Sequence, residues 1–311
     1  MNGLQSKTLI KLLAEKWGIS SALDLDNLIA ELDNSFFSPL STSNTYEFSL
    51  NAFEKTIRPL HLNFYRPSLP LEIINKLRLK RVNAIRRIVR GANHLFSKEW
   101  KYNTNIINYL YQLANKTPWP IQFGCSINQI DAPVIKVYLS ITDNATSRLS
   151  CEETVLELCR FLELEWENFR DVFCNDRYDA VGVDLMSDGR CALKIYTYYV
   201  PPFDYAHIKQ TFQKYQRDEN VMLDPYLTWI KQMSLRHVGF LYRISADSCI
   251  GAIKIWARLE KATLHEHLPV LSLSKRELCS WWEGIPLILH KVAGKISYVI
   301  LEEQSLGVYF R

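Results

Sequence analysis

The chain has 311 residues, which is enough for one large domain or two ordinary ones. Hydrophobic residues make up 48 % and charged residues 23 %, a balance that excludes a largely disordered chain. The net charge of +4, from 37 basic and 33 acidic residues, is too mild to indicate a nucleic-acid-binding protein. Because no apolar stretch approaches 18 residues and the N-terminus has no apolar signal sequence, we expect a cytoplasmic protein with no membrane partner.

Five pairs of predicted strands follow one another along the chain. In each pair a polar link joins two apolar segments, and Asp188-Gly189 in the third link indicates a hairpin, because glycine tolerates the positive φ of a tight turn. The pairs are YEFSL (46–50) with LHLNFYR (60–66), IQFGCSI (121–127) with IKVYLS (135–140), AVGVDL (180–185) with LKIYTYY (193–199), VGFLYRI (238–244) with IKIWARL (253–259), and ISYVIL (296–301) with LGVYFR (306–311).

Segments with helical periodicity separate the strand pairs, at 70–116, 150–173, 205–235 and 273–292. The sequence therefore predicts five repeats of a hairpin followed by helices. Ten antiparallel strands of this kind can close into one barrel surrounded by helices, and closure removes the exposed sheet edges. We expect this barrel to be a single domain spanning residues 1–311.

Charged and aromatic side chains share one face of the predicted strands. Successive residues of a strand point to opposite faces, so Lys194 and Tyr196 oppose the aliphatic residues between them. If the aliphatic face meets the helices, the other face lines the lumen. That face carries Lys136, Lys194, Lys254 and Arg258, the aromatic residues Tyr65, Tyr138, Tyr196, Tyr198, Trp256 and Tyr309, and the carboxylates Glu47 and Asp184.

Cations gathered in a partly dry cavity repel one another unless an anion compensates them. A bound diphosphate would do so, and the aromatic rings could stabilise a carbocation beside it. The alternative is an open sheet whose Lys/Tyr face is simply solvated. A protein-held metal is not expected, because no Cys-x-x-Cys pair occurs and the spaced pair His265 and His267 fits a solvated turn.

The stretch GVDLMSDGRCALKIY (182–196) resembles the cyanobactin prenyltransferases, a branch of the ABBA prenyltransferases. The shared pattern is Gly-x-Asp, then Asp-Gly-Arg, then Ala and Ile-Tyr, and the final YFR (309–311) also fits. The resemblance implies a ten-stranded barrel that holds an isoprenoid diphosphate. It implies transfer of a dimethylallyl or geranyl group to a side chain of a ribosomally made, macrocyclic peptide. It also implies Mg²⁺ bound through the diphosphate, and we expect a monomer.

The resemblance further implies roles for individual residues. Lys136 stands at a position where the family has a diphosphate-binding cation, and Lys194, Lys254 and Arg258 are expected to join it. Where relatives often carry Arg in the first hairpin, this chain has His61, so His61 or Arg58 is expected to complete the set. The implied catalytic base or acceptor clamp is Glu47, and the acceptor pocket is expected to include Asp184 and Arg236, although Asp184 could instead pair with a lysine.

Three other functions stay open at this point. The first is an ABBA prenyltransferase whose acceptor is a small aromatic molecule such as an indole or a phenol. The second is a barrel that binds a ligand without catalysis. The third, nucleic-acid binding, rests on the basic run RLKRVNAIRRIVR (78–90), which fits better as the solvated face of a helix packed on the barrel.

Overall fold

The structure is a computed structural model. It describes residues 45–52, 57–65, 104–116, 121–127, 134–139, 141, 148–170, 177–186, 188–216, 220, 222–260, 296–302 and 305–310. For the first three strands the description covers the backbone alone. Residues 70–103 of the helical segment expected at 70–116, the segment expected at 273–292, and the pair His265 and His267 lie outside these ranges.

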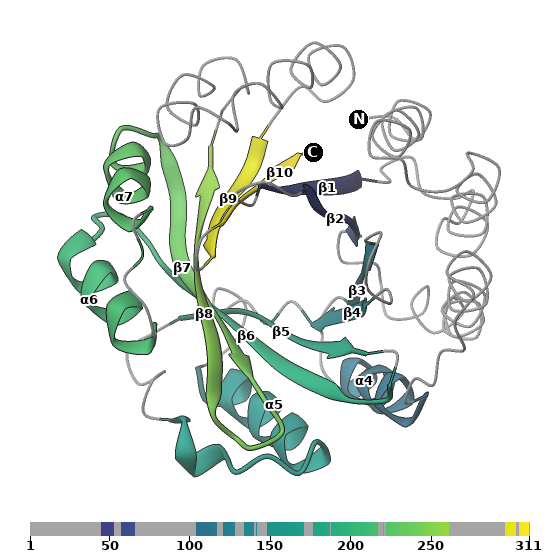
Figure 1. Ribbon diagram of the computed structural model, residues 1–311. Coiled ribbons are helices and arrows are strands. Elements are labelled where there is room, and N and C mark those ends of the chain that lie inside the picture. Colours follow the sequence, from purple (N-terminus) through teal and green to yellow (C-terminus); the bar gives the residue numbers. More distant parts are fainter. Residues whose placement is uncertain are drawn as a thin grey trace, which may run out of the picture.

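Ten strands of the described ranges form one closed antiparallel barrel, with the strand order β1-β10-β9-β8-β7-β6-β5-β4-β3-β2 (Figure 1). Closure occurs where β1 pairs with β10, so the described sheet has no free edge. The strands are β1 (Thr45–Ala52), β2 (Ile57–Tyr65), β3 (Ile121–Ile127), β4 (Val134–Leu139), β5 (Arg177–Leu185), β6 (Cys191–Tyr199), β7 (Leu235–Ile244), β8 (Ile250–Leu259), β9 (Ile296–Glu302) and β10 (Ser305–Phe310).

Helices cover the outside of the barrel (Figure 1). They are α4 (Thr104–Lys116), α5 (Arg148–Phe161), α6 (Tyr205–Tyr215) and α7 (Leu223–Lys231), with a short 3-10 helix at Trp166–Asn168. The predicted barrel with surrounding helices agrees with this arrangement. Because one expected helical segment and most of another are not described, the fivefold repeat of hairpin and helices stays a prediction. Within the described ranges, no helix is long and apolar enough to span a membrane.

The outer face of the strands is the aliphatic face, as predicted. The Tyr226 hydroxyl of α7 lies 3.1 Å from the carbonyl oxygen of Val299 in β9 and 3.4 Å from that of Ile255 in β8. On α6, the ring of Tyr215 packs edge-on against Tyr242 of β7, with the ring centroids 6.3 Å apart. These contacts place α6 and α7 against the face that alternates with the Lys/aromatic face, so the latter lines the lumen.

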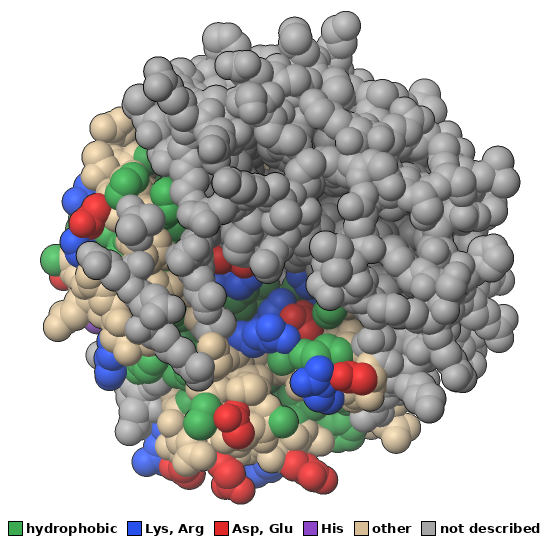
Figure 2. All heavy atoms as spheres, in the orientation of Figure 1, with side chains coloured by type: hydrophobic (Ala, Val, Ile, Leu, Met, Phe, Trp, Pro, Cys, Tyr) green, Lys and Arg blue, Asp and Glu red, His purple; other side chains and the backbone are tan. Residues whose placement is uncertain are grey.

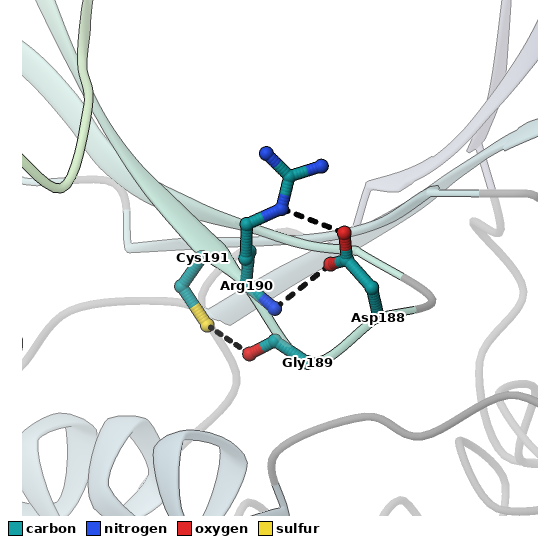
Figure 3. A network of polar contacts seen from close by, with 4 residues as sticks. All are labelled: Asp188, Gly189, Arg190 and Cys191. Atoms are coloured by element: carbon teal, nitrogen blue, oxygen red, sulfur yellow. Dashed lines mark hydrogen bonds and ion pairs between the residues drawn. The ribbon is translucent and has the colours of Figure 1, made fainter.

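The turn between β5 and β6 confirms the hairpin predicted at Asp188-Gly189 (Figure 3). Gly189 has a φ of 88°, which is accessible to glycine at little steric cost. The carboxylate of Asp188 accepts from the backbone N–H of Arg190 at 3.0 Å and pairs with its Nε at 2.6 Å. The turn therefore fixes the register between β5 and β6, and with it the positions of the lumen residues on both strands.

Two helices end earlier than their periodicity predicts. The helix expected over 150–173 is α5, which ends at Phe161 because Glu163 takes a left-handed φ of 57° and the N–H of Leu164 bonds back to the carbonyl of Cys159 at 2.9 Å. The helix expected over 205–235 is two helices. Asn220 separates them, and its side-chain oxygen accepts from the N–H of Met222 at 2.9 Å before α7 begins.

Candidate functional site

Buried charged side chains from neighbouring strands meet inside the barrel. Lys136 and Lys194 are 6 % and 5 % exposed, and Asp184 is 4 % exposed. In the sheet register Lys136 lies directly across from Asp184, while Lys194 lies across from Gly182 and Arg243. The Lys194 ammonium reaches diagonally to the Asp184 carboxylate, with 2.6 Å between Nζ and Oδ2.

A second ion pair joins the neighbouring part of the lumen. Lys254 of β8 pairs with Glu302 of β9, and their side chains keep 22 % and 17 % of their surface exposed. The charge of Lys254 lowers the pKa of both Lys136 and Lys194, so we treat the two ion pairs as one electrostatic group. We call Lys136, Lys194, Arg243 and Lys254, with Asp184 and Glu302, the cation cluster.

The cation cluster holds more positive than negative charge in its described residues. It has four basic side chains and two carboxylates. Burial, and then the neighbouring charge of Lys194, lower the pKa of Lys136 well below its usual value of 10.5. Burial works to raise the pKa of Asp184, but Lys194 and Lys136 outweigh it and hold the pKa below its usual value. An additional anion would therefore relieve the repulsion among the lysines.

Aromatic side chains form a layer next to the cation cluster. Tyr198, Leu241, Trp256 and Ile300 make a buried group, against which Tyr196, Tyr298 and Tyr309 pack. The Trp256 indole N–H donates to the Phe240 carbonyl at 3.2 Å, which fixes the ring against β7. We call these seven residues the aromatic layer.

Tyr138 joins the aromatic layer through Tyr196. The two rings meet edge to face with their centroids 5.7 Å apart. They belong to β4 and β6, and Gly182 of β5 lies between them. A Cβ at Gly182 would come within 2.3 Å of Cδ1 of the Tyr138 ring. Glycine is needed here because it lets the Tyr138 ring lie across the backbone of β5.

A third group lies beyond the aromatic layer. Along β8 the lumen positions are Lys254, Trp256 and Arg258, so Arg258 is about 13 Å from Lys254 at ~3.3 Å per residue. The Arg258 guanidinium lies 5.7 Å from the centre of the Tyr298 ring, and Arg258 is the register partner of His237. The lumen thus changes from cationic to aromatic and then to a mixed Arg, His and Tyr composition along its length.

His237 is held in its neutral form. Its ring lies 4.7 Å from that of Tyr198. Burial, followed by the charges of Arg258, Arg236 and Arg177, lowers the pKa of His237 to about 4. At neutral pH the imidazole is therefore uncharged and offers hydrogen bonds to a polar group without adding a further cation.

The structure brings most of the predicted lumen residues together, with two differences. Lys136, Lys194 and Lys254 meet in the cation cluster, and Tyr138, Tyr196, Tyr198, Trp256 and Tyr309 meet in or beside the aromatic layer. Arg258 is separate from the lysines because it lies two lumen positions further along β8. Arg236 is exposed at the start of β7, and its neighbour His237 is the residue that packs on Tyr198.

The predicted residues of β1 and β2 are placed by their backbone only, and their side chains lie outside the described residues. Glu47 shares a cross-strand row with Lys136, through Asn63 and Gly124. His61 shares the row of Arg258, through Ser49, Tyr309 and Tyr298. Arg58 shares the row of Trp256, and Tyr65 pairs with Thr45.

Sequence reasoning missed four lumen residues. Arg243 lies across from Lys194 in the sheet register, and Glu302 forms an ion pair with Lys254. Tyr298 packs against the Arg258 guanidinium, and His237 packs against the Tyr198 ring. The signal for Arg243 and His237 was present in LRHVGFLYRI, where they lie on the face opposite the apolar residues Val238, Phe240 and Ile244. Glu302 and Tyr298 alternate with Val299 and Leu301 of β9 in the same way.

The arrangement suits an anion with an attached apolar group. Charged side chains gather in the middle of the visible face, beside hydrophobic ones (Figure 2). Lysines and an arginine could neutralise the anion, and the rings could surround the apolar group and stabilise positive charge through their π faces. Among the described residues, no group of three or more His, Cys, Asp or Glu side chains is placed to hold a metal ion.

Comparisons with known proteins identify the fold. No protein-family model matches the chain, and no curated protein matches it in sequence. Solved structures do match. The 5-dimethylallyl tryptophan synthase of Streptomyces coelicolor, in complex with DMASPP and Trp, aligns with a TM-score of 0.70 at 15 % identity and covers 99 % of this chain and 94 % of its own.

Two further structures support the same fold. The prenyltransferase PriB in its apo form aligns at a TM-score of 0.69 and 16 % identity, covering 99 % of this chain and 95 % of its own. AnaPT from Neosartorya fischeri aligns at 0.63 and 13 % identity, covering 98 % and 91 %. The chain has the fold of the aromatic prenyltransferase barrels. At these identities the likeness shows the fold alone.

Proposed function

We propose that the protein is a prenyltransferase that moves a dimethylallyl group from its diphosphate to an aromatic acceptor of the indole class. The observation that carries the proposal is the buried cation cluster beside the aromatic layer, inside a barrel with the fold of tryptophan prenyltransferases. A cationic lumen alone would fit any anion. The adjoining aromatic layer fits a diphosphate ester, because departure of the diphosphate leaves an allylic cation that aromatic rings can stabilise.

In the proposed reaction, the bond between the allylic carbon and the diphosphate oxygen breaks, and the acceptor ring bonds to that carbon. Lys136, Lys194 and Lys254 would stabilise the charge that builds on the departing diphosphate. Mg²⁺, bound through diphosphate oxygens, would supply further charge neutralisation when present. Asp184 and Glu302 are each paired with a lysine, so they are poorly placed to be metal ligands. This fits a Mg²⁺ that would be held by the diphosphate rather than by the protein.

The rest of the site would serve the cation and the acceptor. Tyr138, Tyr196 and Trp256 would exclude water from the cation and stabilise it through their π faces. The proton released from the acceptor ring would pass to Glu47, which we keep as the base because its backbone shares the row of Lys136. The resemblance also proposes Arg58 or His61 of β2 as a further diphosphate ligand. Their backbones share the rows of Trp256 and Arg258 rather than that of Lys136, so either side chain would have to reach along the lumen.

An indole acceptor is favoured over a peptide by the structural neighbours. Several of them are named as dimethylallyl tryptophan synthases, and two contain Trp together with DMASPP. A cyclic peptide is the second candidate, and the observation favouring it is the stretch 182–196, which contains the hairpin Asp188-Gly189-Arg190. An indole carried by a peptide would satisfy both observations.

The experiment that tests the proposal is incubation of the protein with dimethylallyl or geranyl diphosphate and a panel of acceptors, followed by mass spectrometry. The panel contains free tryptophan, indole, a phenol, and matched linear and cyclic peptides with and without Trp. We expect a mass gain of one dimethylallyl group on indole-bearing acceptors, and no product from Lys194→Ala. Parallel reactions with EDTA measure the need for Mg²⁺.

The outcomes separate the candidate functions. Transfer to cyclic peptides but not to free tryptophan or indole would replace the indole proposal by the peptide one. Binding of the diphosphate without product from any acceptor would favour a ligand-binding barrel. No binding of the diphosphate would refute the assignment of the cation cluster.

A further inference from the structure

Asp184 occupies the centre of the cation cluster although its charge has the same sign as the proposed ligand. Its side chain is 6 % exposed, and Oδ2 is bound to Lys194 Nζ at 2.6 Å. The other oxygen, Oδ1, is also buried and has no hydrogen-bond partner among the described residues. A buried carboxylate with one unsatisfied oxygen is costly to the fold, so its presence calls for an explanation.

The neighbours of Asp184 are mostly cations. Lys136 lies directly across from it on β4, and Lys194 and Arg243 approach from β6 and β7. Lys254 of β8 and Glu302 of β9 act electrostatically on the lysines that flank Asp184. The charge of Asp184 also helps to raise the pKa of the Tyr138 and Tyr196 hydroxyls. A diphosphate bound to these lysines would stand beside Asp184 and be repelled by it.

We propose that Asp184 is a positioning residue that stands in for the donor's diphosphate in the empty enzyme. Its carboxylate pairs with the Lys194 ammonium in the empty enzyme, and the bound diphosphate replaces it as the partner of that ammonium. This inference rests on the proposed function, because it assumes that the cation cluster is the diphosphate site.

The physical reason is the cost of leaving ammonium groups buried without an anion. Without a nearby carboxylate, the pKa of Lys194 would fall further, and its ammonium would lack the partner that fixes its direction in the empty site. With the carboxylate in place, the lysine stays charged and oriented. The cost is weaker binding, since the diphosphate must displace one negative charge and then remain near it.

The test is the variant Asp184→Asn, which keeps the shape and removes the charge. Calorimetry with inorganic diphosphate measures the dissociation constant of the variant and of the wild type at each pH. At pH 6.5 we expect the variant to bind about tenfold more tightly, a difference of about 1.4 kcal/mol. Toward pH 9 this advantage should shrink, because Lys194 without its carboxylate gives up its proton at a lower pH.

The matched control is Asp188→Asn, which removes an aspartate of the same hairpin that is exposed and paired with Arg190. We expect no change in diphosphate affinity from it. Comparing the variants as a ratio of dissociation constants at each pH cancels the protonation of diphosphate itself. Thermal unfolding of each variant verifies that it is folded.

The outcomes distinguish this inference from the proposed function. If the wild type does not bind diphosphate, the cation cluster is not the donor site. If the wild type binds and Asp184→Asn binds equally or more weakly at pH 6.5, the stand-in role is wrong. Should Asp184→Asn fail to fold, Glu302→Gln tests the same exchange at Lys254, with tighter binding expected and unchanged or weaker binding refuting it.

Discussion

Replacing Lys136 by methionine removes one buried ammonium and keeps most of the side chain's length and apolar contacts. Lys136 is 6 % exposed, so its charge acts in a poorly solvated environment. A hydrogen bond to a charged group contributes about 1.5–3 kcal/mol. The dissociation constant for the donor should therefore rise by roughly 10- to 150-fold.

The same substitution should stabilise the empty protein. Burial and the charge of Lys194 lower the pKa of Lys136 in the folded state, whereas the unfolded chain keeps its value near 10.5. In the pH range between those two values the unfolded chain binds more protons, so the free energy of unfolding of the wild type rises with pH there. Lys136→Met lacks this contribution, and its advantage in stability should be largest at neutral pH and shrink toward pH 10.5.

Calorimetry with dimethylallyl thiolodiphosphate measures the affinity, and urea unfolding at pH 7 and pH 10 measures the stability. The matched control is Lys209→Met on the exposed side of α6, where the lysine pairs with Asp224. The control should leave donor affinity unchanged. Unaltered affinity in Lys136→Met, or a loss of stability at pH 7, would refute the reasoning that this buried ammonium binds the donor at a cost to the stability of the empty protein.

Three further substitutions test the packing around the lumen. Tyr226→Phe should lower the free energy of unfolding by about 1–3 kcal/mol in urea titrations, because the carbonyls of Ile255 and Val299 lose their buried hydroxyl partner, and donor affinity should stay unchanged. Trp256→Ala should cost about 3–5 kcal/mol of stability by leaving a cavity in the aromatic layer. Gly182→Ala should displace the Tyr138 ring, cost about 1–3 kcal/mol, and lower kcat more than donor affinity.

Each of these predictions has a clear contrary result. Loss of donor affinity in Tyr226→Phe would mean that α7 acts on the lumen and not only on the outer face. A Trp256→Ala variant as stable as the wild type would show that the aromatic layer is not a packed core. Gly182→Ala with unchanged turnover would indicate that Tyr138 does not contact the reacting group.

The alternation along β4, β6 and β8 was accessible from the sequence because it is a local property. Successive strand residues point to opposite faces, so Lys194 and Tyr196 had to share a face once the strand was recognised. The turn at Asp188-Gly189 was accessible for the same reason, because the φ of 88° at Gly189 depends on the residue itself. Closure into a barrel followed from the repetition of such hairpins.

Helix ends and charge partners were not accessible in this way. The end of α5 depends on Glu163, a residue type that rarely takes a left-handed φ, so no sequence signal marks it. The partner of Asp184 is a diagonal neighbour, Lys194, and not the residue directly across from it, Lys136. Which of two nearby lysines a carboxylate takes depends on side-chain reach and strand twist.

The sequence by itself determined the strands, their two faces and the presence of cations and aromatic rings on the inner one, because these follow from periods of a few residues. Only the tertiary structure decided which side chains meet. In the structure Lys254 pairs with Glu302, and Arg243 lies beside the lysines. Arg258 lies apart from the lysines, against the Tyr298 ring. The reason is that cross-strand register and barrel closure join residues that are far apart in the chain, and they thereby set the order of charge and aromatic character along the lumen.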